Sequence, residues 1–427
     1  MSKVVYPPWT VYRGSLVLMC VVLVTGEWRE CCHVPPDMCI LCSMPTLWLL
    51  VVLLTGFGAG TLIFGVRVVR KSTELLPPAV PDRTFTHSPA LSVIIPARNE
   101  ASRIATLLQS LSEQSLEPLE ILVVDDESTD QTAQVAHDHG ARVLSTPPRP
   151  HNWVGKPWAC HTGASESAGE LLLFLDADVE LAPTALERIV AAREATGGVV
   201  SVQPYHRTVC LYESFSALFN AQVVTAVGVG PASRGLFGPC VLFERSAYYR
   251  CGGHEAVQDS VLDDVDLGKC CLQKGTALRN YLGGNAVLFR MYPGGPLEMH
   301  NGWTRNFLQG AGATPTRTLL LQSLWIIGAV TAAAQAALTL AGSALALLGG
   351  WLALGVYAAY AVLLALSVRT YGSFGAAVAL TFPAHLLFFG SVMVRALWIR
   401  AGGGSVDWRG RTVQLHVPDA GETRIVE

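Results

Sequence analysis

Two aspartates that follow a long apolar run are the residues of this chain best suited to chemistry. Residues 171–175 are five consecutive apolar side chains, and Asp176 and Asp178 come directly after them. Such a run predicts a buried β-strand, and carboxylates at the carboxyl end of a strand lie where open α/β sheets bind ligands. Two aspartates one residue apart offer oxygen ligands to a hard cation such as Mg²⁺ or Mn²⁺. The alternative interpretation is that they end a strand and cap the helix that follows.

Other polar residues follow two earlier predicted strands. Residues 91–96 form an apolar strand that ends at Pro96 and is followed by Asn99 and Glu100. Residues 120–124 form a second strand that ends in Asp125 and Asp126. Acidic residues at such a place accept hydrogen bonds from a ribose in dinucleotide folds. We therefore expect these polar residues to line one cleft, while helix capping remains the alternative role for Asn99.

The order of the predicted elements indicates an α/β fold. A helix is expected after Asn99, a second between Ser128 and Gly140, and a third short strand at residues 142–144. Alternating strands and helices imply a mainly parallel sheet with helices on both faces. Neither G-x-G-x-x-G nor G-x-x-x-x-G-K-[ST] occurs, so the glycine-rich phosphate cradles are excluded. A divalent ion on Asp176 and Asp178 would supply the positive charge that a diphosphate needs.

The composition predicts an integral membrane protein. Of 427 residues, 51% are hydrophobic and only 15% charged, which is too apolar for an ordinary soluble enzyme. Residues 46–66 carry no charge, and neither do residues 318–368, which are long enough for two spans. A third apolar run covers residues 370–394. The net charge of −3 gives no reason to expect nucleic acid as a partner.

The positively charged residues indicate a topology but leave the number of spans open. Arg67, Arg70 and Lys71 follow the first span, which places the next domain in the cytoplasm by the positive-inside rule. With four spans, Arg395 and Arg400 fall outside, and so do Arg409 and Arg411. Either one apolar run is re-entrant or interfacial, or the N-terminal apolar run also crosses.

These observations divide the chain into five parts. We predict an N-terminal leader at residues 1–45, a transmembrane helix at 46–66 and a catalytic domain at 67–317. A C-terminal bundle of two or three spans at 318–400 and a polar tail at 401–427 follow. The leader holds Cys39 and Cys42, which are half a zinc site or incidental thiols. No oligomeric state is predicted.

Several motifs resemble the family-two inverting glycosyltransferases of GT-A fold. Residues 93–100 are similar to that family's opening strand and loop, residues 123–130 to its nucleotide-binding turn, and Asp176-Ala177-Asp178 to its metal-binding D-x-D. Further motifs at residues 155–159, 237–240, 252–254 and 302–307 resemble the membrane-anchored enzymes that glycosylate carotenoid acids, and their hopanoid-associated relatives.

The resemblance implies a role for each candidate residue. Residues 262–268 occupy the place of the family's E-D motif, which makes Asp264 the candidate general base and puts Asp263 where the family has glutamate. The alternative is that both aspartates begin a helix, where negative charge is favourable. Donor contacts are implied for Pro96, Asn99, Glu100, Asp125, Asp126, Lys156, Asp176, Trp303 and Arg305, and His254 is either a phosphate contact or a packed histidine. Trp303 could instead anchor the chain at a membrane surface.

The resulting hypothesis is a multi-pass enzyme of the plasma membrane with a cytoplasmic catalytic domain. It would move a hexose from a nucleotide sugar, with UDP-glucose as the default UDP-hexose, to a lipid acceptor in the bilayer, with inversion. The acceptor would be a carotenoid acid or other terpenoid, and the cofactor Mg²⁺ or Mn²⁺. A nucleotidyltransferase, a hopanoid or polyprenyl-lipid glycosyltransferase, and a transporter or scaffold are the alternatives.

Overall fold

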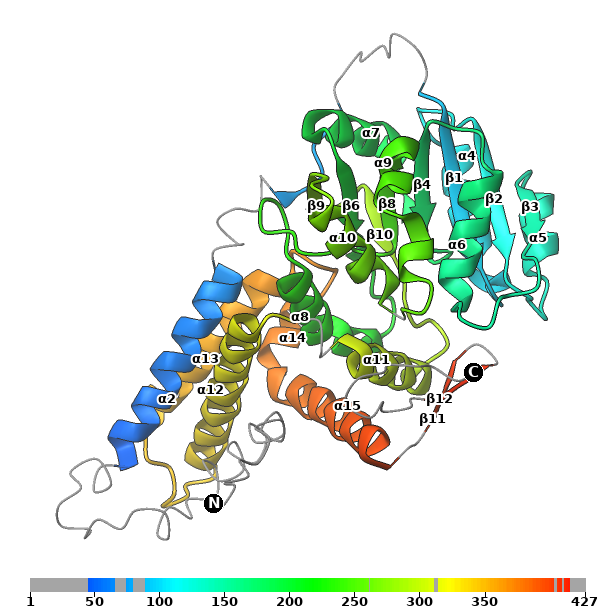
Figure 1. Cartoon of the computed structure of the whole chain (residues 1–427). Coiled ribbons are helices and arrows are strands. Elements are labelled where there is room, and N and C mark those ends of the chain that lie inside the picture. The colour runs from blue at the N-terminus through cyan, green and yellow to red at the C-terminus, as the bar shows by residue number, and fades with distance from the viewer. Residues whose placement is uncertain are drawn as a thin grey trace, which may run out of the picture. The chain divides into compact units, whose positions relative to one another are not determined.

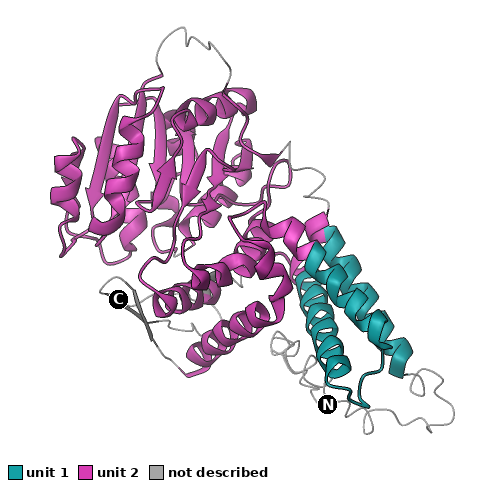
Figure 2. Ribbon diagram, turned by 180° about the vertical axis from the view of Figure 1, so that it is seen from behind, with its two compact units in different colours: residues 1–62, 320–362 teal, residues 63–319, 363–427 magenta. Residues whose placement is uncertain are grey.

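The computed structural model describes residues 45–65, 74–79, 89–260, 262–310, 314–402, 405–408 and 411–414. These form two compact units, coloured separately in Figure 2: residues 1–62 with 320–362, and residues 63–319 with 363–427. The predicted leader with Cys39 and Cys42 lies outside the described residues, and so do Arg67, Arg70, Lys71 and Arg409.

A seven-stranded sheet in the order β3–β2–β1–β4–β8–β6–β9 forms the centre of the second unit (Figure 1). Its strands are β1 (Leu91–Ala97), β2 (Glu120–Asp125), β3 (Arg142–Ser145), β4 (Leu171–Leu175), β6 (Val199–Gln203), β8 (Cys240–Glu244) and β9 (Leu278–Leu282). All neighbours pair in parallel except β8, which runs antiparallel to β4 and β6. The predicted mainly parallel α/β fold is confirmed, and the first three strands lie within one residue of their predicted bounds.

The register of the strands brings the predicted cleft together. Ala97 at the end of β1 pairs with Asp125 at the end of β2, and Ile94 of β1 pairs with Phe174 of β4. Because these three strands are parallel, their carboxyl ends meet at one edge of the sheet. Asp176 therefore follows β4 at the same edge that Asp125 reaches from β2.

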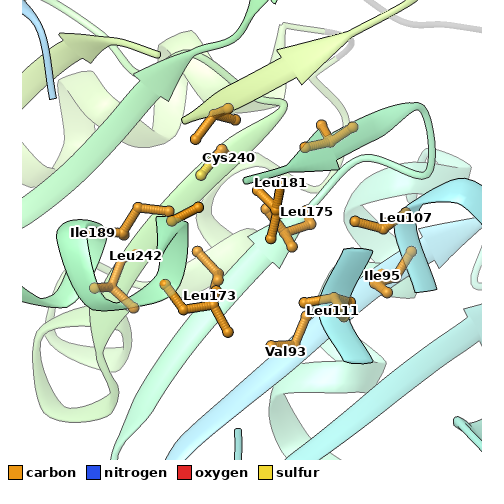
Figure 3. Close-up of a cluster of buried hydrophobic side chains, with 14 of the residues drawn as sticks. Val93, Ile95, Leu107, Leu111, Leu173, Leu175, Leu181, Ile189, Cys240 and Leu242 are labelled. Carbon is orange, nitrogen blue, oxygen red and sulfur yellow. The ribbon is translucent and has the colours of Figure 1, made fainter. Parts of the chain in front are cut away.

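Helices cover both faces of the sheet. They are α4 (Ala101–Ser112), α5 (Thr132–Asp138), α6 (Gly155–Glu166), α7 (Ala185–Thr196), α9 (Arg245–Arg250), η6 (Gly253–Val257) and α10 (Asp263–Gln273). Along β4, Leu173 and Leu175 enter one hydrophobic cluster while Leu172 and Phe174 enter the other. A strand that is buried on both faces has no polar positions, which explains the uninterrupted apolar run. Figure 3 shows the first cluster, with Leu173, Leu175 and Leu242 beside Val93 and Ile95.

A second, three-stranded sheet lies after the aspartates. It consists of β5 (Val179–Leu181), β10 (Val287–Phe289) and β7 (Tyr205–His206), with β10 in the middle. β10 is antiparallel to β5 and parallel to β7. The turn at Asp176–Asp178 therefore links the two sheets.

The same unit contains further helices toward its C-terminal end. They are η5 (Leu211–Ser216), α8 (Ala217–Val227), α11 (Pro296–Gly310), α14 (Ala376–Leu380) and α15 (Phe382–Gly402). Strands β11 (Ser405–Trp408) and β12 (Arg411–Gln414) pair antiparallel after them. The chain between α13 (Gly350–Val368) and α14 is joined to β7, because His206 N–H donates to Tyr371 O and Ser373 N–H donates to His206 O.

Four helices of the described part of the chain are long and apolar enough to cross a membrane. They are α2 (Pro45–Gly60) with the π-helical turn η4 (Thr61–Gly65), α12 (Thr316–Leu340), α13 and α15. From the sequence, the apolar run at residues 370–394 is expected to form one segment. The structure instead breaks it at Thr381, so the long helix begins at Phe382 and ends eight residues later than the run.

Helix contacts in the first unit depend on two glycines. A methyl group on Gly328 of α12 would lie 2.1 Å from Tyr360 Oη and 3.0 Å from Gly56 Cα. Tyr360 Oη donates to Leu53 O across 2.8 Å. Small residues at such a place allow helix backbones to approach closely in a membrane.

We expect Gly328→Ala to lower the thermal midpoint of the purified protein. The added methyl group must displace Tyr360, and overpacking of this kind costs about 1–3 kcal/mol. Gly355→Ala in α13 is the matched control, because nothing lies within 4 Å of a methyl group there. Equal midpoints for the two variants would show that the close approach is not needed.

Acid is expected to destabilise the second unit through His206. Burial lowers the pKa of His206 to about 4, and its Nδ1 accepts a hydrogen bond from Asn220 Nδ2 at 3.0 Å. The unfolded chain binds a proton near pH 6.5 that the folded chain takes up only near pH 4. Stability is therefore complete above pH 6.5 and falls by about 1 kcal/mol per pH unit below it.

Thermal midpoints measured between pH 7.5 and 5 test this expectation. His206→Gln should be less stable at pH 7.5 but should lose less on acidification than the original chain. His137→Gln, at an exposed position of α5, is the control and should keep the original pH dependence. Unchanged pH dependence in His206→Gln contradicts the assignment.

Candidate active site

The turn after β4 presents the first two aspartates. Asp176 N–H donates to Pro239 O, and Val179 N–H donates back to Asp176 O at 3.2 Å. Ala177 between them is buried in the core, so both carboxylates leave the strand end on the side away from it. The backbone bonds hold this turn against the segment that precedes β8.

Helix α10 brings the candidate base to the same place. Asp263 and Asp264 are its first two residues, so they begin a helix as the alternative interpretation expects, but neither is the N-cap, which is Leu262. A methyl group on Gly238 would lie 1.8 Å from Asp264 Oδ2, and one on Gly268 would lie 2.6 Å from Gly235 Cα. Glycine at these positions is therefore what allows α10 to approach the start of β8.

Lys156 joins the two acidic groups. Its ammonium Nζ lies 2.9 Å from Asp176 Oδ1 and 3.2 Å from Asp264 Oδ2. Lys156 is the second residue of α6, which begins at Gly155. Three elements that are separated in sequence thus meet at one cation: the β4 turn, the start of α6 and the start of α10.

Burial and charge shift the pKa values at this cluster. Burial and the neighbouring Asp176 raise the pKa of Asp178 to about 7, although Arg103 and Lys156 act against this. Burial also raises the pKa of Asp264, while Lys156 opposes the rise. Burial lowers the pKa of Lys156, but the carboxylates of Asp176 and Asp264 outweigh it, so the net pKa is well above its usual value. The ammonium is therefore charged at neutral pH.

The loops after β1 and β2 are fastened to each other. Asn99 has a φ of 52°, and its side-chain oxygen accepts a hydrogen bond from Thr129 N–H at 2.8 Å. The alternative role of Asn99, to cap α4, is not observed, because the N-cap of that helix is Glu100. Asp130 instead accepts hydrogen bonds from Ala101 N–H and Thr132 N–H, at the starts of both helices. The strand-end loops are thus held together at the cleft.

The two aspartates after β2 differ in their surroundings. Asp126 is buried, and its backbone oxygen accepts a hydrogen bond from Arg98 Nη1 at 2.7 Å. Asp125 Oδ1 is also buried but has no hydrogen-bond partner among the described residues. A buried carboxylate oxygen without a partner is costly unless a ligand donates to it. Pro96 lies on the neighbouring strand, where it pairs with Val124.

Arg103 is a site residue that the sequence reasoning missed. It forms ion pairs with Glu100, at 3.1 Å, and with Glu298 of α11, and its charge acts on Asp178. Arg103 is the third residue of α4 and follows Glu100 by three positions. Because residues three apart share a helix face, this spacing was a signal from which the ion pair with Glu100 could have been predicted. The partner Glu298 is almost two hundred residues away and could not be found from spacing.

Of the two predicted residues of α11, Arg305 is linked electrostatically to the site and Trp303 is not. Arg305 is largely buried, which lowers its pKa, and it is within electrostatic range of Asp176 and Asp263. Trp303 is 2% exposed, stacks on Phe219 with ring centroids 4.6 Å apart, and donates from Nε1 to Ser216 Oγ. We therefore assign Trp303 to packing, since neither face of its ring is open to a ligand or to a membrane surface.

His254 lies beside the candidate base as a buried histidine. Tyr248 Oη accepts a hydrogen bond from His254 N–H and lies 2.9 Å from Nδ1, to which it can donate its proton. Burial, and then the charge of Lys156, lower the pKa of His254 to about 3. The ring is neutral at pH 7, and its Nδ1 is hydrogen-bonded to Tyr248 Oη. This explains the histidine after Gly252 and Gly253 as a packed, oriented group.

The described residues fit a divalent cation. Ligand atoms of His254, Asp263 and Asp264 lie within 4.8 Å of one another, and Asp263 Oδ2 is buried without a hydrogen-bond partner in the described chain. Burial, and then the charge of Asp176, raise the pKa of Asp178 to about 7, and a bound cation would favour its carboxylate form. Because Mg²⁺ and Mn²⁺ prefer carboxylate oxygens to imidazole nitrogen, the oxygen pair Asp176 and Asp178 is the better match for either ion.

Comparison with known proteins agrees with this geometry. Residues 92–252 match the family model described as glycosyl transferase family 2. The chain is 32% identical over 377 residues to 4,4'-diaponeurosporenoate glycosyltransferase of Staphylococcus aureus strain MRSA252, covering 86% of this chain and 97% of that protein. The protein of the same name from strain USA300 is 31% identical over the same shares. The chain belongs to glycosyl transferase family 2.

A solved structure supports the fold. A mannosyltransferase from Pyrobaculum calidifontis, in complex with GDP-Man and Mn²⁺, superimposes with a TM-score of 0.51 and 22% identity, over 82% of this chain and 98% of that one. The predicted GT-A fold is therefore confirmed. The family model ends at Gly252, before Asp263 and Asp264, so the role of these two residues depends on the geometry described above.

Gly238→Ala is expected to reduce turnover by tenfold or more while the protein still folds. The methyl group would occupy the position of Asp264 Oδ2 and force that carboxylate away from Lys156. A misplacement of about 1 Å at a reacting group can cost about 100-fold. Release of nucleoside diphosphate measures the rate, and the thermal midpoint reports folding. Full turnover in a folded variant would exclude Asp264 from the chemistry.

Proposed function

We propose that this protein transfers a hexose from a nucleotide sugar to a lipid acceptor, with inversion at the anomeric carbon. The observation that carries the proposal is the cluster in which Lys156 Nζ lies between Asp176 and Asp264. It sits at the sheet edge where β1, β2 and β4 end. One edge thus holds carboxylates for a cation, a base for an acceptor and positive charge for a diphosphate.

The nucleoside would bind at the ends of β1 and β2. Asp125 Oδ1, buried without a described partner, is placed to accept a hydrogen bond from a base or ribose donor. Asp126 is held by the Arg98 contact and supports the neighbouring loop. Pro96, Asn99 and Glu100 would shape the floor of this subsite from β1. UDP-glucose is the proposed donor.

The diphosphate would lie over Asp176 and Asp178. These side chains would hold Mg²⁺ or Mn²⁺, and the ion would supply positive charge that stabilises the departing nucleoside diphosphate. Lys156 and Arg305 would add positive charge on the protein's side of the same group. Arg103 would orient Asp178, whose charge it already influences.

Asp264 would act on the acceptor. A hydroxyl oxygen attacks the anomeric carbon, its proton passes to the Asp264 carboxylate, and the bond from that carbon to the phosphate oxygen breaks. Burial that raises the pKa of Asp264 makes it a stronger base for this step. A carboxylic acid acceptor is ionised at neutral pH, and Asp264 would then matter less.

The acceptor is proposed to be a membrane lipid of the terpenoid class, such as a carotenoid acid. The S. aureus relatives are named for glycosylation of diaponeurosporenoate, and four helices among the described residues are apolar enough to cross a bilayer. We call the second unit, residues 63–319 with 363–427, the catalytic unit. A multi-pass arrangement in the plasma membrane, with the sheet of the catalytic unit in the cytoplasm, accommodates both facts. A terpenoid acceptor would then remain dissolved in the bilayer while its polar end enters the cleft.

Asp264→Asn is expected to lower turnover on a hydroxyl-bearing acceptor by about 100-fold or more, since positioned general bases contribute that much. Asp178→Ala should abolish the Mn²⁺-dependent part of UDP binding measured by calorimetry. Asp266→Asn is the matched control on α10, because the Asp266 carboxylate bonds Ser260 and Lys269. Release of UDP from UDP-glucose with purified protein and candidate lipids provides the rate.

The outcomes separate the parts of the proposal. Full activity in Asp178→Ala would remove the metal assignment. A loss in Asp264→Asn with hydroxyl acceptors but not with carboxylic acids would assign the acceptor class. Failure of UDP to bind with or without Mn²⁺ would overturn the choice of donor. Lipid analysis of cells with and without the chain then identifies the glycosylated product.

A further inference from the structure

One face of α15 is covered by the catalytic unit. The buried residues lie along one side of the helix at intervals of three or four, with one adjacent pair at 385 and 386: Phe382, His385, Leu386, Phe389, Val392, Ala396 and Ile399. His385 stacks on Phe215 with ring centroids 4.5 Å apart. The ring of Phe389 packs against that of Phe219 in α8, with centroids 4.9 Å apart. Figure 1 shows α15 lying along α11. A helix that meets lipid on all sides has no such covered stripe.

The covered face also carries polar contacts. Arg395 Nη1 donates to Asn301 Oδ1 at 2.5 Å and lies 2.9 Å from His300 Nδ1. His300 Nε2 lies 3.3 Å from Ser391 Oγ. From Phe382 to Arg395 the helix advances about 20 Å, at 1.5 Å per residue. The contacts with the catalytic unit therefore extend along α15 for about 20 Å, which is two thirds of the thickness of a hydrocarbon core of about 30 Å.

Helix α11 cannot follow α15 into hydrocarbon. Its 15 residues include Glu298, His300, Asn301 and Arg305. A charged side chain at the bilayer centre costs about 2.5–3.5 kcal/mol on insertion scales. Glu298 is also paired with Arg103 of α4, and Arg305 acts on the carboxylates of the cleft. Because α11 must stay at the aqueous side, α15 must stay there with it.

The other face of α15 is apolar and exposed. Leu387 and Trp398 are 77% and 72% exposed, and Val394 lies between them on the same side. Leu380 of α14 extends this exposed surface. An apolar stripe with tryptophan on a helix whose other face is covered suits the boundary between headgroups and acyl chains.

The end of α13 lies on the side of the catalytic unit. Three residues after Val368, the chain begins its contact with β7, through Tyr371 and Ser373. Thr208 N–H also donates to Ser373 Oγ at 2.8 Å. A segment joined this closely to the catalytic unit cannot emerge on the opposite side of the bilayer.

We propose that α15 lies along the membrane surface as a lipid-facing helix of the catalytic unit, and that α2, α12 and α13 are the described helices that cross. The inference rests on the multi-pass arrangement proposed above. It places Arg369, Arg395 and Arg400 on the same side as Arg67, Arg70 and Lys71, with Arg409 and Arg411 of the tail. Three spans thereby satisfy the positive-inside rule that four spans violate.

The first experiment compares three full-length proteins, each with one epitope. One epitope is inserted at the exposed turn His139–Gly140 of the catalytic unit, one after Ala344 between α12 and α13, and one at the C-terminus. Intact and permeabilised spheroplasts are treated with protease. We expect digestion of only the Ala344 epitope in intact spheroplasts, and of all three after permeabilisation.

The alternative outcomes have separate meanings. Digestion of the C-terminal epitope but not the His139 epitope in intact spheroplasts shows that α15 crosses and overturns the inference. Digestion of both, with a protected Ala344 epitope, reverses the proposed orientation but supports the surface position of α15. Protection of all three contradicts the spans α12 and α13, and with them the multi-pass proposal.

The second experiment measures depth. Tryptophan is placed at Leu387 or at Val394, each in a Trp398→Phe background, and fluorescence is quenched by lipids brominated at two depths. Because the chain has nine other tryptophans, the quenching of the added residue is taken as the difference from the Trp398→Phe protein. A surface helix gives both positions the same depth. A crossing helix separates them by about 10 Å, because seven residues lie between them. Different depths at the two positions would overturn the inference.

Discussion

The arrangement of the cleft depends on one electrostatic constraint: carboxylates that converge in a half-buried place require a cation between them. Asp176 and Asp264 come from different elements, and Lys156 lies within 3.2 Å of both. Without that ammonium, two negative charges at low dielectric would repel each other and favour protonation. The start of α6 is therefore as much a part of the site as the aspartates.

Close backbone approach makes this convergence possible. Gly238 leaves room for the Asp264 carboxylate, while Gly235 and Gly268 let α10 lie directly against the segment before β8. The β4 turn is hydrogen-bonded to Pro239 in the same segment. The motif around residues 237–240 is thus explained by the space that it leaves, and none of its side chains needs to touch a substrate.

The strands of the sheet and the position of the aspartates could be predicted from the sequence, because both are indicated by residues that are close together in the chain. The uninterrupted apolar run of β4 reports burial on two faces, and Asp176 and Asp178 follow it directly. The sequence was insufficient for Trp303, whose motif suggested a ligand contact but whose ring is stacked in the core on Phe219. It also missed the pair of Arg103 with Glu298. Such contacts join distant residues, and no spacing in the chain reports them.

Helix α11 connects two environments, since His300 and Asn301 meet α15 while Arg305 reaches toward the carboxylates of the cleft. An acceptor that approaches along this helix travels in two dimensions. Its effective concentration is then its mole fraction in the bilayer, so diluting the membrane with inert lipid slows the reaction even when the total amount of acceptor is constant. For the same reason, the rate of this enzyme would depend on how the acceptor partitions between lipid domains.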